Sequence, residues 1–509
     1  MSGRYADELV EGGFAVEVAD APLLHDGLNV ADLAHLLVLR ERGIVPEHVV
    51  PRLAAVLREA DATPAGEFGY DPEHGEVYSC RERRFAAAIG RDAGWLHAGR
   101  PRREAVRIAL RLRVRRDLAA LVTAAADVVL ATARAADAHA ETLMVEHTYL
   151  QHAQPSTLGH HLLGVAYPVL RDVERLVAEL DRLDRSPAGA GGVNGSPLTG
   201  ERTRTAALLG FAGVIEHTGD AMWQADGLTA VVAHAAGLVT TLDRLAEDLE
   251  IWSSEEFGWV RLAAGHTRTS VLMPQKRNPY ALTMVRGEAG VLIGRATGML
   301  ALAKSPSARS DQLIFAYGEV PRALDLATRA TRLMAEVVAG LEVDAAAMEA
   351  TLRAGFSQAA DLAEHLMITA GLDYRSAYDV VGAAVRRAEA EGLAGVDLTP
   401  SMLVDAAAAT GLEADALGPV VDGDLTAVLD PAAIVRSRDS RGGAAPSVVR
   451  AMAADCAEAA EIVRADVMAR RARWDDAEDD VRRRAARLAG NDAGAPTRDR
   501  STDTDAERL

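Results

Sequence analysis

The chain has 509 residues, more than one compact hydrophobic core usually holds, so we expect two or three structural units. Its formal net charge of -19 argues against a general nucleic-acid binder, which needs a basic face. Two cysteines, Cys80 and Cys456, are too few for a disulfide framework or a cysteine-rich zinc site. They predict free thiols in a reducing compartment, and therefore a cytoplasmic protein.

The hydropathy of the chain predicts no attachment to a membrane. The first residues, MSGRYADELVEGG, lack a basic start followed by an apolar run, so we expect no secretory signal. No stretch of about 20 uninterrupted apolar residues occurs, so we also expect no membrane span.

Most of the chain is predicted to be helical, because apolar residues recur at three- and four-residue spacing and Ala, Leu, Arg and Glu dominate. We expect a first unit over residues 1–104. Residues 103–144 then run almost without a helix breaker and predict a helix roughly 60 Å long. Similar stretches follow it and predict a central bundle of long helices over residues 105–370. These stretches are 156–183, 226–253, 279–304 and 316–341.

Glycine and proline mark the breaks between these helices. A glycine-rich loop is predicted over Pro187–Pro197, and a second non-helical segment over Gly258–Pro274. Shorter helices with more frequent Gly and Pro predict a smaller C-terminal helical domain over residues 371–475. The low hydrophobicity of residues 476–509 predicts a disordered tail. The predicted fold class is all-α, a long-helix bundle with smaller N- and C-terminal helical domains.

The run TRTSVLMPQKRNP, which ends at Pro279, combines features suited to a carboxylate. Asn278 before Pro279 predicts a helix start, with Asn278 as the cap and Pro279 in the first turn. The positive end of the following helix favours an anion. The simpler alternative is a plain helix cap with no ligand.

Two side chains in this run suggest chemistry. Only two of the 55 basic residues are lysines, Lys276 and Lys304, so Lys276 indicates a place where a compact ammonium is needed. The hydroxyl of Ser270 is suited to remove a proton alpha to a bound carboxylate, if nearby positive charge stabilises its alkoxide. The alternative is that Lys276 is a surface charge and Ser270 a loop serine.

The run Ser270–Pro279 resembles the signature GSSxMPxKxNP of the fumarase/aspartase superfamily. Other stretches resemble argininosuccinate lyases in the same order, so that the resemblance covers about residues 20–390. They are Asp92–Arg102, Thr148–His161, Ser186–Gly195, Leu242–Phe257 and Ala359–Leu366.

This resemblance implies a fumarase/aspartase-like bundle and a homotetramer in which three subunits build each active site, without metal or organic cofactor. It implies a carbon–nitrogen lyase, of the kind used in arginine biosynthesis. Such an enzyme removes a proton beside one carboxylate of a small dicarboxylate, an N-succinyl compound such as argininosuccinate. It then expels the nitrogen from the neighbouring carbon and releases fumarate.

The resemblance also assigns roles to residues. Ser270 matches the catalytic base, and Lys276 matches the group that holds a succinyl carboxylate and stabilises the carbanion. The residues that match or adjoin substrate-binding positions are Thr148, Gln151, Asn278, Arg102, Arg103 and Gln275.

The second motif departs from the family pattern at a catalytic position. The family has Thr-His, whereas this chain has Thr148-Tyr149. Tyrosine has an ordinary pKa near 10, so Tyr149 is a poor base but a candidate general acid. His147 and His152 lie nearby in sequence, but neither occupies the matching position, so we expect both to be structural or surface residues.

Other departures fall where the family binds the rest of its substrate. They are Pro101-Arg102-Arg103-Glu104 for Ser-Arg-Asn-Asp, Gln224-Ala225-Asp226-Gly227 for Asp-Arg-Asp-Phe, Ala31-Asp32 for Gly-Ser, a replaced tyrosine near Ser310, and Thr269 and Val271 in the signature. These changes suggest a retained reaction with a different leaving group, recognised by Arg103 and Asp32. Argininosuccinate itself stays open, because Arg103 is able to replace the arginine lost at Ala225.

Two alternatives from other classes remain. One is a catalytically silent structural or regulatory homologue. The other is a scaffold of stacked helices, which the lack of a repeat argues against. The sequence also lacks a phosphate-binding loop, a His-Glu-x-x-His zinc motif and a nucleophile elbow.

Overall fold

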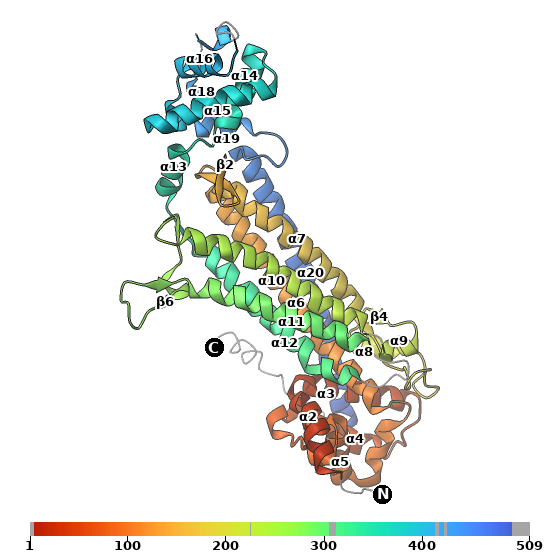
Figure 1. The fold of residues 1–509 in the computed structure, drawn as a ribbon. Helices are drawn as coiled ribbons and strands as arrows, with labels where there is room; N and C mark the ends of the chain where they lie inside the picture. The colour runs from red at the N-terminus through yellow and green to blue at the C-terminus, as the bar shows by residue number, and fades with distance from the viewer. Residues whose placement is uncertain (1–4, 224, 305–311, 413–416, 422–424, 491–509) are drawn as a thin grey trace.

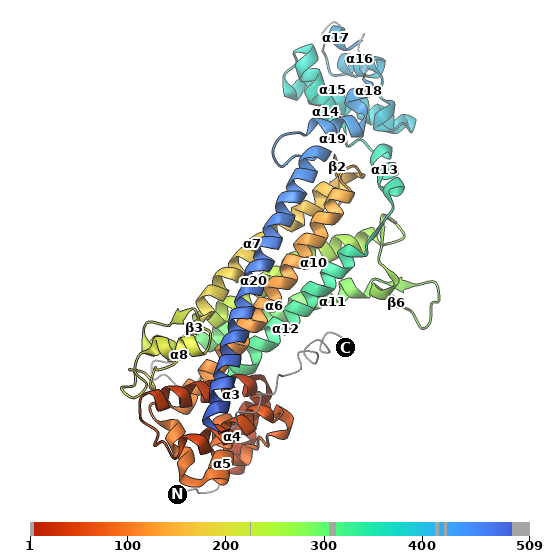
Figure 2. The same cartoon turned by 180° about the vertical axis from the view of Figure 1, so that it is seen from behind.

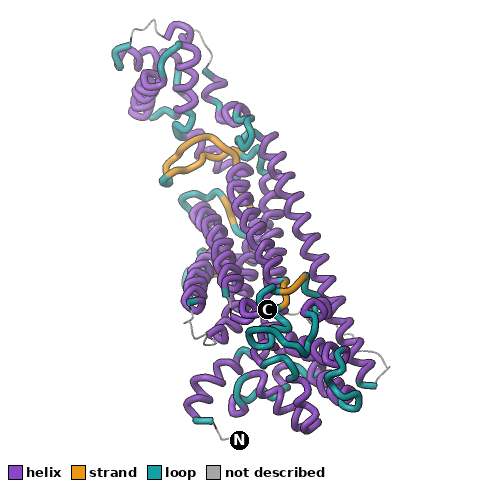
Figure 3. The backbone as a smooth tube through the Cα atoms, turned by 90° about the vertical axis from the view of Figure 1, so that its right-hand side faces the viewer, coloured by secondary structure: helices purple, strands orange, loops and turns teal. Residues whose placement is uncertain are grey.

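A computed structural model describes residues 5–223, 225–304, 312–412, 417–421 and 425–490. The molecule is elongated, with a compact N-terminal unit at one end, long helices in the middle and a smaller helical unit at the other end (Figures 1 and 2). In the described residues the strands form only two-stranded pairs (Figure 3). The predicted all-α long-helix bundle is confirmed.

The N-terminal unit packs short helices around one hydrophobic core. Its helices are α1 (Asp7–Leu9), the π-helical η1 (Val10–Phe14), α2 (Ala15–Ala19), α3 (Ala21–Glu41), α4 (Val50–Ala62), α5 (Val77–Ile89) and the 3-10 turns η2 (Ala65–Glu67), η3 (Pro72–His74) and η4 (Gly90–His97). Leu36 of α3 and Leu53 of α4 lie in this core.

Long helices build the middle of the molecule. They are α6 (Arg102–Ala138), α7 (Leu158–Leu183), α10 (Asp226–Trp252), α11 (Tyr280–Ala303), α12 (Ala316–Ala339) and α20 (Pro446–Leu488). The ends of α7, α10, α11 and α12 agree with the predicted stretches within two residues. The first predicted helix is too long, because α6 ends at Ala138 and Leu143–Thr148 is the strand β1.

Helix α6 is the core helix of the bundle. By length and composition it is the one helix in the described ranges that could cross a membrane, but 67% of its most apolar window is buried inside the protein. Burial of that degree is what a core helix of a bundle shows, so this finding is weak evidence for a membrane span.

The predicted disordered tail is wrong for residues 476–488, which continue α20. Its apolar residues Val481 and Ala485 are buried in the N-terminal core. Its charged residues pair with residues much earlier in the chain, as in Arg482 Nε to Asp61 Oδ2 at 3.0 Å. The charged composition of this segment therefore belongs to a helix that ion pairs hold against the rest of the protein. The rest of the predicted tail, 491–509, lies outside the described residues.

The C-terminal domain also differs from the prediction of 371–475. Its hydrophobic core begins at Leu362, which is before the predicted boundary. Gly371, which was predicted to mark that boundary, is the left-handed C-cap of α14 (φ 67°) and lies inside the domain. Residues 446–475 belong to α20, which runs back along the bundle. The helices of this unit are α14 (Ala359–Ala370), α15 (Tyr374–Glu391), η7 (Gly395–Asp397), α16 (Pro400–Ala409), α17 (Gly418–Val421), α18 (Thr426–Leu429) and α19 (Pro431–Ser437). The helix before it, α13 (Ala345–Ala354), buries Met348 and Leu352 in the core of the bundle.

Short elements join the helices and carry most of the motifs. They are β1 (Leu143–Thr148) with β2 (Gln151–Thr157), β3 (Arg185–Ser186) with β4 (Gly213–Val214), β5 (Val260–Arg261) with β8 (Glu342–Val343), β6 (Arg268–Thr269) with β7 (Arg277–Asn278), α8 (Arg202–Leu208), α9 (Thr218–Trp223), η5 (Ala264–His266) and η6 (Gln312–Phe315). The pair β3–β4 is parallel and the others are antiparallel.

Candidate active site

The signature run forms a hairpin that projects from the side of the bundle (Figure 1). The backbone N–H of Ser270 donates to the carbonyl of Lys276 at 3.3 Å. The candidate base and the candidate ammonium therefore lie opposite each other, where the two strands of the hairpin meet its loop. The Oγ of Ser270 accepts the backbone N–H of Met273 at 3.0 Å and that of Leu272 at 3.3 Å. Two such donors also stabilise an alkoxide.

The predicted role of Asn278 as helix cap is wrong. Asn278 lies in β7, and its Nδ2 donates to the carbonyl of Arg268 at 3.0 Å, across the hairpin. Pro279 is the N-cap of α11, which makes no side-chain cap bond and begins at Tyr280. The asparagine therefore fastens the hairpin, while the positive end of α11 still follows directly behind it.

The tip of this hairpin exposes apolar side chains. Val271 and Leu272 are both largely open to solvent, and Gln275 and Lys276 are exposed beside them. An exposed apolar loop next to polar candidate residues is typical of a surface that another molecule covers. Neither of the two cavities described below is lined by these residues.

The second motif forms the hairpin β1–β2, in which Thr148 lies opposite Gln151. Its two-residue turn is Tyr149–Leu150, with φ of 55° and 58°. Non-glycine residues rarely adopt this left-handed conformation, and two in a row store strain that commonly accompanies a functional site. Tyr149 is 99% exposed, so this turn holds its phenol away from the protein.

The two histidines of this hairpin pack against each other and against aromatic rings. The ring centres of His147 and His152 lie 5.3 Å apart, and the ring of His147 lies 5.5 Å from that of Trp259. Burial, followed by the neighbouring His152, lowers the pKa of His147. A small cavity of about 430 Å³ lies beside this hairpin. Its lining is Leu150, Gln151, His152, Gly355, Phe356 and Ser357.

The first motif lies at the N-terminal end of α6, beside a cavity of about 680 Å³. Arg102 donates two hydrogen bonds to the carboxylate of Glu82, with Nε at 2.8 Å. Arg103 donates to Glu17, with Nη1 at 2.6 Å. Both arginines line the cavity while held by carboxylates, so their guanidinium groups are fixed in place before any ligand arrives.

Glu104 ties the glycine-rich loop to this same end of the bundle. Its buried carboxylate accepts the backbone N–H of Gly189 and of Gly191, both at 2.7 Å. Burial raises the pKa of Glu104 despite these two bonds. Sequence reasoning missed this role, because the two glycines that Glu104 binds lie 85 and 87 positions away in sequence.

Asp32 does not have the predicted role in recognising a leaving group, because its side chain is completely buried. Its carboxylate accepts bonds from Arg81 (2.9 Å), Arg100 and the phenol of Tyr78 (2.6 Å). Burial alone would raise the pKa of Asp32, but the two arginines outweigh burial and lower it. The acid that stands where the family has serine is therefore a structural ion pair. Gln224 and the position near Ser310 lie outside the described residues.

The motifs lie far apart within one chain. Arg102 begins α6, whereas Tyr149 lies beyond its other end, and the 37 residues of that helix span about 55 Å. No small dicarboxylate reaches from one to the other. If both act on one substrate, they must come from different copies of the chain.

A long-helix bundle with these hairpins defines a helical lyase, and sequence comparison agrees. Residues 55–294 match the lyase family and residues 356–436 match the argininosuccinate lyase C-terminal family. The chain is 30% identical over 453 residues to the argininosuccinate lyase of Methanothrix thermoacetophila, covering 89% of this chain and 90% of that protein. It is 36% identical over 423 residues to that of Mycobacterium avium, covering 82% and 87%.

Solved structures show the same fold. An EDDS lyase variant with bound fumarate has a TM-score of 0.82 and 25% identity, covering 100% of this chain and 98% of that one. A fumarate lyase from Mesorhizobium sp. BNC1 has a TM-score of 0.66 and 21% identity, covering 90% and 99%. The chain belongs to the argininosuccinate lyase family. The family and the carbon–nitrogen lyase class predicted from the motifs are confirmed.

Proposed function

We propose that this chain catalyses β-elimination from argininosuccinate or a related N-succinyl compound, releasing fumarate and an amine or guanidine. The observation that carries the proposal is the hydrogen bonding of Ser270, whose Oγ accepts two backbone N–H groups in the hairpin that also presents Lys276. These donors favour the negative oxygen that a serine needs in order to act as a base.

The proposed reaction has two bond-breaking steps. The Ser270 alkoxide takes the proton from the carbon beside one succinyl carboxylate, and the electron pair moves toward that carboxylate. Lys276 and Asn278 stabilise the resulting charge by ionic and hydrogen-bond contact. The electron pair then forms the double bond of fumarate while the bond to nitrogen breaks. Tyr149 donates its phenolic proton to the departing nitrogen.

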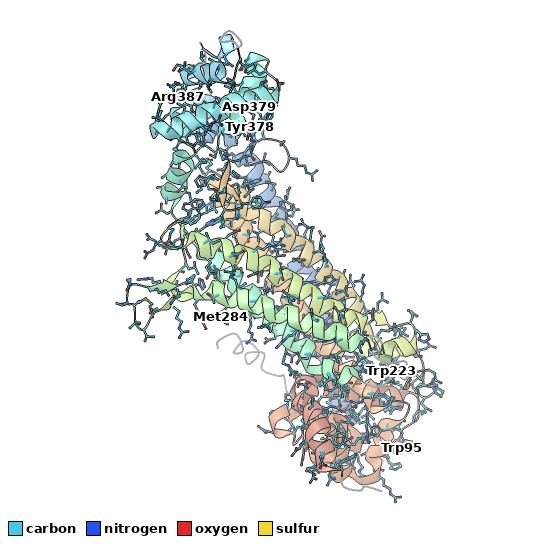
Figure 4. All side chains as sticks on the ribbon, in the orientation of Figure 1. Trp95, Trp223, Met284, Tyr378, Asp379 and Arg387 are labelled. Carbon is cyan, nitrogen blue, oxygen red and sulfur yellow. The ribbon has the colours of Figure 1, made fainter. Side chains whose placement is uncertain are left out.

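The site is proposed to be shared among copies of a homotetramer. Besides the 55 Å separation of the motifs, α11 supports this assembly, because it leaves apolar side chains exposed along the bundle, among them Met284 (Figure 4). The others on α11 are Val291, Ile293 and Leu300. Gly287, Gly290 and Gly294 of the same helix have open space where a side chain would stand, which admits a close helix.

The remaining assignments concern binding. Thr148, Gln151, Gln275, Arg102 and Arg103 are proposed to hold the substrate. Ala225 lies at the start of α10, and the neighbouring Met222 carbonyl accepts a bond from Arg107 of α6 at 3.1 Å. Arg103 and the lost arginine position thus share one end of the bundle, which keeps argininosuccinate among the substrates. The enzyme is proposed to work in the cytoplasm without a metal or organic cofactor.

A substrate panel tests the proposal. Purified chain is incubated with argininosuccinate and with N-succinyl amines and amidines, and fumarate is followed by its ultraviolet absorbance. We expect fumarate from at least one compound, and none when Ser270→Ala replaces the wild type. Absence of fumarate from every compound at high enzyme concentration would support the catalytically silent homologue instead.

Removing the phenol of Tyr149 is expected to lower kcat by about 100-fold, the effect of losing a general acid. The Tyr149→Phe protein should fold normally, because this side chain lies in solvent in the single chain. The measurement is kcat on the best compound of the panel, with melting temperature as the control. Unchanged turnover removes Tyr149 from the mechanism.

A further inference from the structure

A histidine behind the second-motif hairpin joins three elements, and the mechanism above does not use it. His161 of α7 places Nδ1 at 3.2 Å from Glu146 Oε2 and Nε2 at 3.3 Å from Asp248 Oδ2. Glu146 lies on β1, two residues before Thr148, and Asp248 lies on α10. The His161 side chain is 18% exposed and that of Glu146 29%, whereas the Asp248 side chain is 41% exposed, so the contact with Glu146 is the better shielded from water.

These two contacts require a charged ring. A neutral imidazole carries one N–H and so cannot donate to two carboxylates, whereas the imidazolium donates from both nitrogens. Burial opposes the charge on His161, but the bonds to Asp248 and Glu146 outweigh burial and raise its pKa to about 9. Burial likewise raises the pKa of Glu146, but its bond to His161 outweighs that effect and lowers it.

The surroundings connect this ring to the hairpin. The ring of Trp252 lies 4.7 Å from that of His161 and 5.7 Å from that of Trp259, which in turn packs against His147 of β1. The charged or titratable groups around the pair are Glu146 and His147 of β1, His160 of α7 and Asp248 of α10. His160 bonds elsewhere, to Ser156 Oγ and to the carbonyl of Gly442.

The strands of the hairpin also pack against α13 and α19, but its two turn residues lie in solvent. Tyr149 and Leu150 are exposed and occupy the strained left-handed conformation. The position of the phenol therefore depends on how the base of the hairpin is fixed. A displacement of about 1 Å at a reacting group can cost on the order of 100-fold in rate.

We propose that His161 is a positioning residue of the lyase reaction, whose imidazolium fastens β1 to α10 and thereby fixes Thr148 and Tyr149 against the substrate. This inference rests on the proposed function for its effect on turnover. Its structural part, the fastening of the hairpin, stands independently and is measurable without any substrate.

The test compares His161→Gln with His234→Gln. The control histidine joins the same two helices, with Nε2 at 3.7 Å from Glu179 Oε1, but does not contact the hairpin. We expect His161→Gln to lower kcat by about 10- to 100-fold with KM changed only a few-fold, because a positioning loss acts on the reacting geometry. His234→Gln should keep the wild-type kcat.

The pH profile gives a readout that a purely structural role would not move. The folded-state pKa of His161 is raised above its ordinary value, so the fastening is complete below about pH 6.5 and is lost as pH rises through about 9. Wild-type kcat should fall through that range, and Tyr149→Phe should keep this fall. His161→Gln should lack it.

The rate of backbone hydrogen exchange in residues 143–157 tests the fastening of the hairpin without an activity measurement. Faster exchange in His161→Gln, but not in His234→Gln, supports the fastening even if no substrate is found. Unchanged exchange in that segment overturns the inference, as does wild-type kcat in His161→Gln. Failure of the wild type to release fumarate from any compound counts against the proposed function alone.

Discussion

Replacement of Ser270 with alanine is expected to lower kcat for fumarate release by about 10²- to 10⁴-fold, the usual effect of losing a general base. The alanine has no oxygen to take the proton, and the N–H groups of Leu272 and Met273 lose the acceptor that they hold in the folded chain. Because these groups lie on an exposed hairpin, water replaces the lost bonds and the fold should persist.

Rates are measured on the best compound of the substrate panel, at saturating substrate and with melting temperature recorded in parallel. Thr267→Ala is the matched control, since it removes a neighbouring exposed hydroxyl that bonds only to the carbonyl of Ala264. The control should keep the wild-type kcat. A Ser270→Ala enzyme within tenfold of the wild type would show that another group removes the proton.

Replacement of Asp32 with asparagine is expected to lower the free energy of unfolding of the N-terminal unit by about 3–5 kcal/mol. The substitution leaves Arg81 and Arg100 buried without their counter-charge, and the cost of burying an unpaired charge is large. The lowered pKa of Asp32 means that its contribution is present at neutral pH and is lost as pH falls through the carboxyl range.

Thermal or urea unfolding at neutral pH measures this loss. Glu41→Gln is the control, because it removes a pair with Arg204 in which both side chains are about two-fifths exposed. Exposed pairs contribute at most about 1 kcal/mol, so this control should unfold close to the wild type. An Asp32→Asn protein as stable as the wild type would contradict the buried ion-pair assignment.

The long helices were predictable because each buries an apolar stripe that repeats at the helical period. The start of α11 followed from the helix breaker Pro279, which acts locally, although Asn278 is not its cap. The signature run was recognisable because its residues are contiguous. Local pattern and contiguous motif were thus enough for the fold class, the family and the candidate base.

Features that depend on distant partners were not predictable. The charged end of α20 looked disordered, because its partners, such as Asp61, lie more than 400 positions away in sequence. Asp32 was predicted to recognise the leaving group, because the sequence does not show that Arg81 and Arg100 surround its carboxylate. The donors to Ser270 Oγ are backbone groups, which leave no trace in side-chain identity.

The turn of the second-motif hairpin was not predictable for a different reason. Its turn residues, Tyr149 and Leu150, are poor formers of the left-handed turn that they adopt, so no asparagine or glycine marked it. Local preference and observed conformation disagree here, next to a candidate catalytic residue. Such disagreement is most common at functional or strained sites.

The central claim is that motifs separated by the length of α6 act on one substrate across copies of the chain. Mixing subunits of Tyr149→Phe with subunits of Arg102→Ala, after dissociation and reassembly, tests it most directly. Each variant alone should release almost no fumarate, while the mixture should regain up to about a quarter of wild-type activity, since that share of shared sites receives both intact residues. Activity in the mixture no higher than the sum of the two separate variants would contradict the account.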